Sequence, residues 1–353
     1  NTMSSIVHPE RCEAQLPPAS NTGGNSFSTS PNTSLAFVDT LTFTLPIEHL
    51  STDPAVSIMH DAEGISSAIC DAFLGVFHLA IGAPTGQRKN GYVDSAPILS
   101  PSVDPLSNGK ASLGYVAWGG NQNVFGQDTL CVYLTGAACE HLNLLDSYPG
   151  CDVWQTLYWA LLKHGAKITR LDCAHDDLEG SMGGIDTAVA AYHEGGFTLR
   201  RPPSVNQQGD WINGHSRTFY IGKRENGKLV RIYEKGHQLG VDDSPWVRYE
   251  VELHSRDRVI PLGAILRPAE TLAGSAPYLA DVLASVKPVP VKTTIKHRIR
   301  LTVDKLVATC SVSYGRLVNV MVGIGMTSDQ IVSSLRRDGM PSRLYVPPSA
   351  VPA

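Results

Sequence analysis

The sequence lacks the residue spacings that mark many metal-binding and nucleotide-binding proteins. Its 353 residues contain no Cys-x-x-Cys pair, no His-x-His pair and no Gly-x₄-Gly-Lys-Ser/Thr loop. These absences argue against a zinc site and against a phosphate-binding P-loop. The seven cysteines are odd in number and scattered, which favours free thiols in a reducing cytoplasm.

Long apolar segments are also missing. No run of about 18 apolar residues occurs, so we expect no transmembrane helix and no membrane partner. The first residues lack a basic region followed by an apolar one, so they do not predict a secretory signal. Residues 1–34 are rich in Ser, Thr, Asn, Pro and Gly without periodicity, which predicts a disordered lead.

Charge is distributed unevenly along the chain. The net charge is −4, which by itself argues against a nucleic-acid partner. However, residues 1–110 hold four Lys/Arg against ten Asp/Glu, whereas residues 285–345 hold ten Lys/Arg against three Asp/Glu. Because a polyanion responds to the local patch more than to the total, DNA binding stays possible. Chance variation of surface charge is the alternative.

The segment Arg217–Gly236 predicts a hairpin with an unusual polar face. Asn226-Gly227 is a strong signal for a two-residue turn, which would place Tyr220 opposite Tyr233. Side chains alternate faces along a strand, so one face is apolar and suited to a core. The other face carries mainly cationic and small polar groups together with Tyr220: Thr218, Tyr220, Gly222, Arg224, Arg231, Tyr233 and Lys235.

Two further segments show the same alternation and add carboxylates. Residues 168–177 place Asp172 and Asp176 on one face together with Arg170. Residues 246–253 place Glu250 and Glu252 on one face together with Arg248. Hard divalent cations prefer oxygen ligands, so these carboxylates are candidate ligands for Mg²⁺ or Mn²⁺. An antiparallel sheet with one solvated face would show the same pattern.

The order of elements predicts an α+β fold. We expect strands at 35–45, 75–81, 114–118 and 129–134, with a short helix at 65–75. A helix over 152–164, a strand, a second helix over 184–194, the hairpin and a final strand follow, and this order suggests antiparallel sheets with helices packed on one face. Duplicated βαβ-like halves are one possible arrangement. A mostly helical region follows, with helices expected at 261–272, 276–285, 303–323 and 328–338. We therefore divide the chain into a disordered lead (1–34), an α+β domain (35–260) and a helical basic C-terminal region (261–345).

At RLDCAHDD, FYIGKRENGKLVRIYEKG and WVRYEVELHSRDRVIP the chain resembles the Rep_trans family, the replication initiation factors of rolling-circle plasmids and filamentous phages. The stretch GNQNVFGQDTLCVYLTGAAC is also similar to that family. The resemblance extends over roughly residues 36–340 and is most specific from 168 to 258. The family's tyrosine lies in a Tyr-x-Gly-Ser-Arg-like motif, which Tyr220 to Arg224 match except that Lys223 replaces the serine.

The resemblance implies an enzyme that nicks one strand at an origin, becomes joined to the 5′ end through a tyrosine and frees a 3′-OH primer. It also implies a divalent metal and a bacterial cytoplasm. Tyr220 is then the predicted nucleophile, with Tyr233 as the rival, and either could be an ordinary sheet tyrosine. The remaining candidates are Arg224 and Arg231 for catalysis, Asp172, Glu250, Glu252 and Asp176 for the metal, and Lys223, Lys235, Arg248, Arg336 and Arg337 for DNA.

Two functions remain open from the sequence. The first is a metal-dependent, sequence-specific nickase and strand transferase that acts on an origin, as single strand or extruded duplex. The second is a non-catalytic origin-binding or regulatory protein on the same scaffold. Salt bridges and solvated charges are the plain alternative for the candidate ligands and phosphate contacts. A host helicase and a second copy of the chain are further candidate partners.

Overall fold

A computed structural model of the chain describes residues 35–50, 62–100, 112–123, 126–241, 243–293 and 303–339. The expected disordered lead, residues 1–34, lies outside these described residues. The chain divides into two compact units, Asn1–Thr294 and Ile295–Ala353. No helix within the described ranges is long and apolar enough to cross a membrane.

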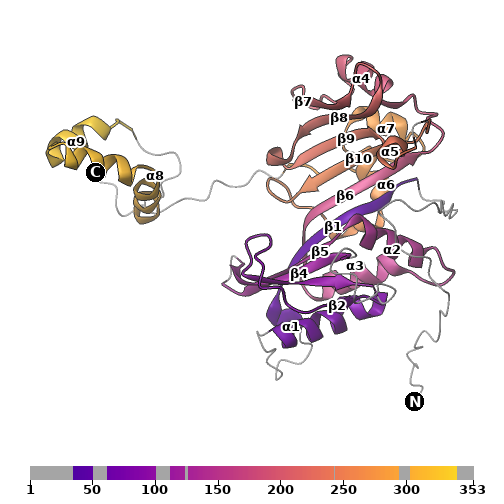
Figure 1. Cartoon of the computed structure of the whole chain (residues 1–353), viewed down its shortest axis with the longest axis horizontal. Helices are drawn as coiled ribbons and strands as arrows, with labels where there is room; N and C mark the ends of the chain where they lie inside the picture. The colour runs from indigo at the N-terminus through magenta and orange to yellow at the C-terminus, as the bar shows by residue number, and fades with distance from the viewer. Residues whose placement is uncertain are drawn as a thin grey trace, which may run out of the picture. The chain divides into compact units, whose positions relative to one another are not determined.

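The described part of the first unit is built on one antiparallel sheet of ten strands, ordered β2-β3-β4-β5-β1-β6-β10-β9-β8-β7 (Figure 1). The strands are β1 (Phe37–Pro46), β2 (Ala80–Ile81), β3 (Asp94–Leu99), β4 (Gly114–Gln122), β5 (Asp128–Leu134), β6 (Lys167–Asp177), β7 (Val205–Asp210), β8 (His215–Lys223), β9 (Lys228–Glu234) and β10 (Val247–His254). This sheet confirms the predicted α+β class with antiparallel pairing.

The sheet consists of two halves that follow the same strand order outward from the centre. β1 and β6 pair at the centre, and each begins its own half. From β1 the order runs β5, β4, β3, β2, and from β6 it runs β10, β9, β8, β7. A helix follows the first strand of each half, namely α1 (Ala62–Ile69) and α4 (Gly184–His193). The duplicated arrangement considered from the sequence is therefore present at the level of topology.

Helices cover one face of the sheet and leave the other polar. The first unit contains α1, α2 (Gly136–Asp146), α3 (Val153–Lys163), α4, α5 (Lys235–Gln238), α6 (Pro268–Ala273) and α7 (Pro277–Val282). One apolar core takes Leu142 of α2, Leu157 of α3 and Ile185 of α4, together with Leu171 and Val251 of the sheet. Burial of these side chains supplies the main driving force for folding.

Several local predictions needed correction. Residues 75–81 were expected as a strand, but Gly75–Phe77 form a 3-10 helix and only Ala80–Ile81 pair. The helix expected over 261–272 is a 3-10 helix, Leu262–Leu266, followed by α6, because Pro268 has no N–H to continue a helix. α2, β3 and β7 were not predicted. β7 is exposed along its whole length, so its sequence shows no alternation.

The second unit is described as two helices, α8 (Val303–Gly323) and α9 (Ser328–Leu335). Thr327 is the N-cap of α9, and a capping box with Gln330 closes its first turn. The helix ends at Leu335, three residues before the predicted position 338, because Arg336 takes an extended backbone. Residues 262–282 pack in the first unit. The boundary at residue 260 between a domain that acts on DNA and a C-terminal region stays a prediction.

Gly114 allows the close pairing of β4 with β5. Its φ is +149°, and a Cβ at this position would lie 1.9 Å from the Tyr133 carbonyl oxygen. We therefore expect Gly114→Ala to lower the free energy of unfolding by roughly 3 kcal/mol or more. Gly86→Ala is the control, since it also has positive φ but no atom within 4 Å of a new Cβ. It should cost roughly 1–2 kcal/mol in urea denaturation, and equal losses for both variants would contradict the steric explanation.

Candidate active site and metal centre

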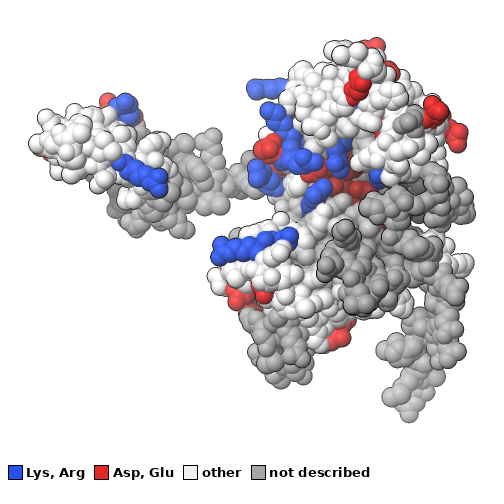
Figure 2. Space-filling view, viewed as in Figure 1, with Lys and Arg blue, Asp and Glu red and all other residues white. Residues whose placement is uncertain are grey.

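The acidic residues gather where β6 pairs with β10. In this ladder Asp172 lies opposite Glu252, Asp176 lies opposite Arg248, and Glu250 lies opposite Ala174. All these side chains share the face that the helices leave uncovered, as the alternation predicted. Figure 2 shows acidic side chains flanked by Lys and Arg over the part of the sheet where β6, β8, β9 and β10 lie.

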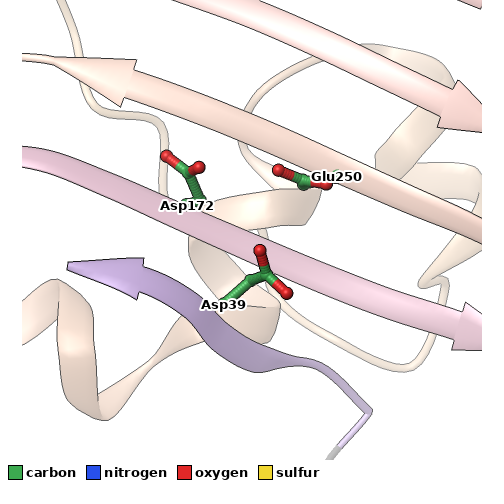
Figure 3. Close-up of side chains that lie close together, drawn as sticks. All are labelled: Asp39, Asp172 and Glu250. Carbon is green, nitrogen blue, oxygen red and sulfur yellow. The ribbon is translucent and has the colours of Figure 1, made fainter. Parts of the chain in front are cut away.

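A bulge in β1 brings a third carboxylate to this face. The register of β1 against β6 shifts between Val38 and Thr40, so Asp39 is the extra residue. Val38 remains in the core, whereas Asp39 turns toward the neighbouring carboxylates (Figure 3). Bulges are used in this way to redirect a side chain next to a site.

Asp39, Asp172 and Glu250 form a carboxylate triad at the centre of the face. One oxygen of each lies within 4.8 Å of the others, and the Asp172 and Glu250 side chains are fully buried. Burial raises the pKa of Asp172, and the nearby Glu250 and Glu252 add to this rise against the opposing effect of Arg170. Burial also raises the pKa of Glu250, although Arg231 opposes it.

Three arginines bind the carboxylates of the triad, one arginine for each carboxylate. Arg170 donates to both Asp172 oxygens, at 3.0 and 2.6 Å. Arg231 forms an ion pair with Glu250. Arg248 donates from Nη1 to Asp39 at 2.8 Å, while its Nε and Nη2 atoms bind Asp176 at 2.7 and 2.8 Å. Each carboxylate position is therefore determined by a charged hydrogen bond.

The other two predicted ligands are occupied by cations. Glu252 accepts hydrogen bonds from Arg224, at 2.8 and 3.0 Å, and its Oε1 is also hydrogen-bonded to His254 Nε2. Burial tends to raise the pKa of Glu252, but His254 and Arg224 lower it to about 2. Asp176 is bound by Arg248 through both oxygens. Both carboxylates lie beside the triad rather than in it.

The donor set fits a hard divalent cation. All three groups offer oxygen, the ligand atom that Mg²⁺, Mn²⁺ and Ca²⁺ prefer. Four arginines bind the five carboxylates of Asp39, Asp172, Asp176, Glu250 and Glu252, and His254 also hydrogen-bonds Glu252. Burial is the main cause of the raised pKa values of Asp172 and Glu250, and neighbouring carboxylates add to it. These residues could hold a metal ion.

Tyr220 lies on the same face, two strands away from Glu250. It is half-buried in β8 and opposite Arg231 of β9, which in turn lies opposite Glu250 of β10. This register corrects the predicted pairing with Tyr233. Arg224–Asn226 form a 3-10 turn and only Gly227 has positive φ, so the connection is four residues long. The correction shifts the pairing by two residues, which preserves the face of every side chain.

Tyr233, the rival nucleophile, is engaged with the triad. Its hydroxyl donates to Glu250 Oε2 at 3.3 Å. Burial and the Glu250 charge raise the pKa of this hydroxyl well above its usual value. Tyr233 therefore supports Glu250, whereas no described residue hydrogen-bonds the Tyr220 hydroxyl.

The residues predicted to contact DNA lie on both units of the chain. Lys223 is exposed at the end of β8. Lys235 donates to Gln238 at 3.1 Å and lies 5.9 Å from the ring centroid of Tyr233. Arg248 is 12% exposed and committed to its two carboxylates. Arg336 and Arg337 are exposed in the second unit, immediately after α9. Their contacts with DNA stay predictions.

Residues 166–326 match the Rep_trans family, described as replication initiation factor. Over this segment the chain is similar to that family. The matched segment includes β6 to β10 but not the first half of the sheet, so it is narrower than the resemblance over 36–340. The rolling circle replication initiator protein from Geobacillus stearothermophilus has a solved structure that aligns at 20% identity over 74% of this chain and 99% of that chain, with a TM-score of 0.47. No curated protein matches the chain.

Asp39 is the site residue that sequence reasoning missed. It lies in LAFVDTLTFTL, which was predicted as a strand without a site residue. The usable signal was a single acidic residue at the centre of an otherwise uncharged strand. Its face could not be assigned, because the bulge between Val38 and Thr40 breaks the period of two.

We expect Arg248→Met to destabilise the protein strongly. The change leaves Asp39 and Asp176 without their shared cation, and removing one partner of a buried ion pair costs about 3–5 kcal/mol. Urea denaturation measures the loss. Arg256→Met, at an exposed position, should change stability by less than about 0.5 kcal/mol. The prediction fails if the two variants are equally stable, and adding Asp39→Asn and Asp176→Asn to Arg248→Met should recover part of the loss.

Proposed function

We propose that the chain is a metal-dependent DNA-nicking enzyme that starts rolling-circle replication at an origin. One observation carries the proposal: Tyr220, Arg231 and Glu250 lie in one row across β8, β9 and β10, on the face that holds the carboxylate triad. The similarity of residues 166–326 to replication initiation factors supports DNA as the substrate. The family resemblance supplied the expectation that a tyrosine performs the cleavage.

In the proposed reaction the Tyr220 oxygen attacks the phosphorus of a phosphodiester. A bond forms between this oxygen and phosphorus, and the bond from phosphorus to the 3′ oxygen breaks. The proton lost by Tyr220 is matched by the proton that the leaving 3′ oxygen gains. The product is a 5′-phosphotyrosine and a free 3′-OH, and because the ester is conserved, the reverse reaction can join two ends.

The residues around Tyr220 are suited to a phosphate. Arg231 lies beside Tyr220, and its buried Nε has no hydrogen-bond partner among the described residues. That donor is free for a phosphate oxygen while Glu250 holds the other end of the guanidinium. Arg224 is 52% exposed and adds a second cation at the edge of the face. Guanidinium groups bind phosphate through paired N–H donors.

Asp39, Asp172 and Glu250 would hold Mg²⁺ or Mn²⁺ in this proposal. The bound ion supplies charge that polarises the phosphate and stabilises the oxygen that leaves. Asp176 and Glu252 lie outside the triad and would not contact the ion. Asp176 positions Arg248, and Glu252 positions Arg224 and His254. Residues in this outer position orient ligands and tune the site.

Covalent capture tests the nucleophile. The protein is incubated with Mn²⁺ and a labelled single strand carrying the origin, and the adduct is resolved under denaturing conditions. Tyr220→Phe should abolish the adduct, because the ring remains but the attacking oxygen is gone. Tyr233→Phe is the matched control and should still form the adduct. An adduct with Tyr220→Phe would contradict the assignment, and DNA binding without a nick under any metal would identify a non-catalytic origin binder instead.

Calorimetric titration with Mn²⁺ tests the metal site. Asp39→Asn, Asp172→Asn and Glu250→Gln should each weaken Mn²⁺ binding by at least roughly tenfold, since each removes one charged ligand. Asp186→Asn is the control, because that side chain is 77% exposed outside the triad. Wild-type affinity in all three triad variants would show that the ion binds elsewhere.

Partners and location complete the proposal. We place the protein in the bacterial cytoplasm, which agrees with the free state of all six cysteines in the described residues. A host helicase and a second copy of the chain stay predictions.

A further inference from the structure

The polar face of the sheet continues beyond the carboxylate triad into the first half. Thr42 of β1 lies opposite Arg170 of β6 on one side and opposite Tyr133 of β5 on the other. Tyr133 in turn lies opposite Tyr115 of β4. One row of side chains therefore leads from Arg170, which binds Asp172, to a pair of tyrosines.

The two tyrosine rings are stacked and partly open. Their centroids lie 5.0 Å apart, with the ring planes tilted by 36°. Both side chains are half-buried, and no described residue hydrogen-bonds either hydroxyl. Burial raises the pKa of both hydroxyls, that of Tyr115 to about 12, so neither ring carries a negative charge that would repel a phosphate at neutral pH.

A rigid turn holds a lysine beside this pair. Asn90 and Gly91 have φ values of +50° and +85°, and Tyr92 N donates to the Lys89 carbonyl at 2.8 Å. The Tyr92 hydroxyl lies 2.9 Å from Thr129 Oγ1, which fastens the turn to β5. Lys89 is exposed, and its Nζ lies 5.9 Å from the Tyr115 ring centroid. Figure 2 also shows cationic side chains over the region of β4.

The topology makes this position informative. β4 and β5 hold the places in the first half that β9 and β10 hold in the second. On the uncovered face of β9 and β10 lie Arg231 and Glu250, which belong to the proposed nicking site. On the same face of β4 and β5 the tyrosine pair lies instead.

We propose that Tyr115, Tyr133 and Lys89 form a stacking platform for bases of single-stranded DNA next to the scissile phosphate. The inference rests on the proposed function for its substrate. Aromatic side chains on an open sheet face bind unpaired bases because every base has a π-face, and a neighbouring cation attracts the backbone. β5 and β6 are separated only by β1, so the platform is about 10 Å from the triad, or roughly three stacked nucleotides.

Binding of a mixed-sequence, dye-labelled 20-mer single strand tests the platform, with fluorescence anisotropy as the readout. The assay is done in EDTA on the full chain with Tyr220→Phe as background, so it requires neither nicking nor metal. Tyr115→Leu and Tyr133→Leu should each weaken binding roughly 5- to 100-fold, the usual range for loss of one stacked base. Tyr115→Phe and Tyr133→Phe should bind as the background does, since the ring is retained.

Tyr158→Leu is the matched control. Tyr158 is also half-buried and also pairs with an aromatic ring, that of Trp159 at 5.0 Å, but it lies on α3 outside the polar face. It should leave DNA affinity unchanged. Equal affinity for Tyr115→Leu, Tyr133→Leu and Tyr158→Leu would overturn the platform and leave the tyrosines as an ordinary cross-strand pair that stabilises the sheet.

Photocrosslinking tests the platform without substituting Tyr115 or Tyr133, so a folding defect in those variants cannot affect the result. Single strands with 5-iodouracil at successive positions are bound to the otherwise unaltered Tyr220→Phe protein and irradiated. Crosslinks at Tyr115 or Tyr133 from a short run of positions support the proposal, and crosslinks confined to other residues refute it. If the strand never nicks with Tyr220 intact but crosslinks to these tyrosines, the nicking function fails while the platform stands.

Discussion

β6 hydrogen-bonds to β1 along one edge and to β10 along the other, and the candidate site exists because of these two ladders. The register with β10 places Asp172 opposite Glu252 and next to Glu250. The register with β1 contains the bulge that turns Asp39 toward them. A slip of one residue in either ladder would move carboxylates into the apolar core, so burial of the opposite face protects the geometry. The hydrophobic core thus determines where the charged groups lie.

Burial of these charged groups costs free energy, because they lose their hydration. Asp172, Glu250 and Glu252 have no exposed side-chain surface, and a buried ion pair rarely gains more than its desolvation removes. The raised pKa values of Asp172 and Glu250 show that the arginines do not fully compensate for the burial of these carboxylates. A core that needed only stability would place apolar residues here. Buried carboxylates with raised pKa values are typical of functional sites, and a divalent cation would fit this group of oxygen ligands.

Much of this site could be predicted from alternation alone. The faces of Tyr220, Arg231, Asp172 and Glu250 follow from a period of two and from the need to bury the intervening residues. The pairing of Tyr220 could not be predicted, because Asn226-Gly227 suggested a tight turn and the chain instead uses Arg224–Asn226 as a 3-10 turn. Asp39 was missed because a bulge has no signature in a single sequence, and β7 because an exposed edge strand has no apolar period. Local patterns determine which face a residue takes, whereas long-range pairing determines its neighbours.

In the proposed function, the two halves of the sheet would contact different parts of a DNA strand. The second half, β6 to β10, lies within the segment that matches the family model, and it carries the candidate tyrosine, the four arginines and two of the three triad carboxylates. The first half lies outside that segment, yet it contributes Asp39 through β1 and the tyrosine pair through β4 and β5. Because β1 is both the inner strand of one half and the source of a carboxylate for the other, neither half holds the complete triad. In the proposed function, a DNA strand that lies along the row from Tyr115 to Arg170 contacts the tyrosine pair before it reaches the carboxylates. Base stacking and phosphate cleavage would then occur at different positions on the sheet.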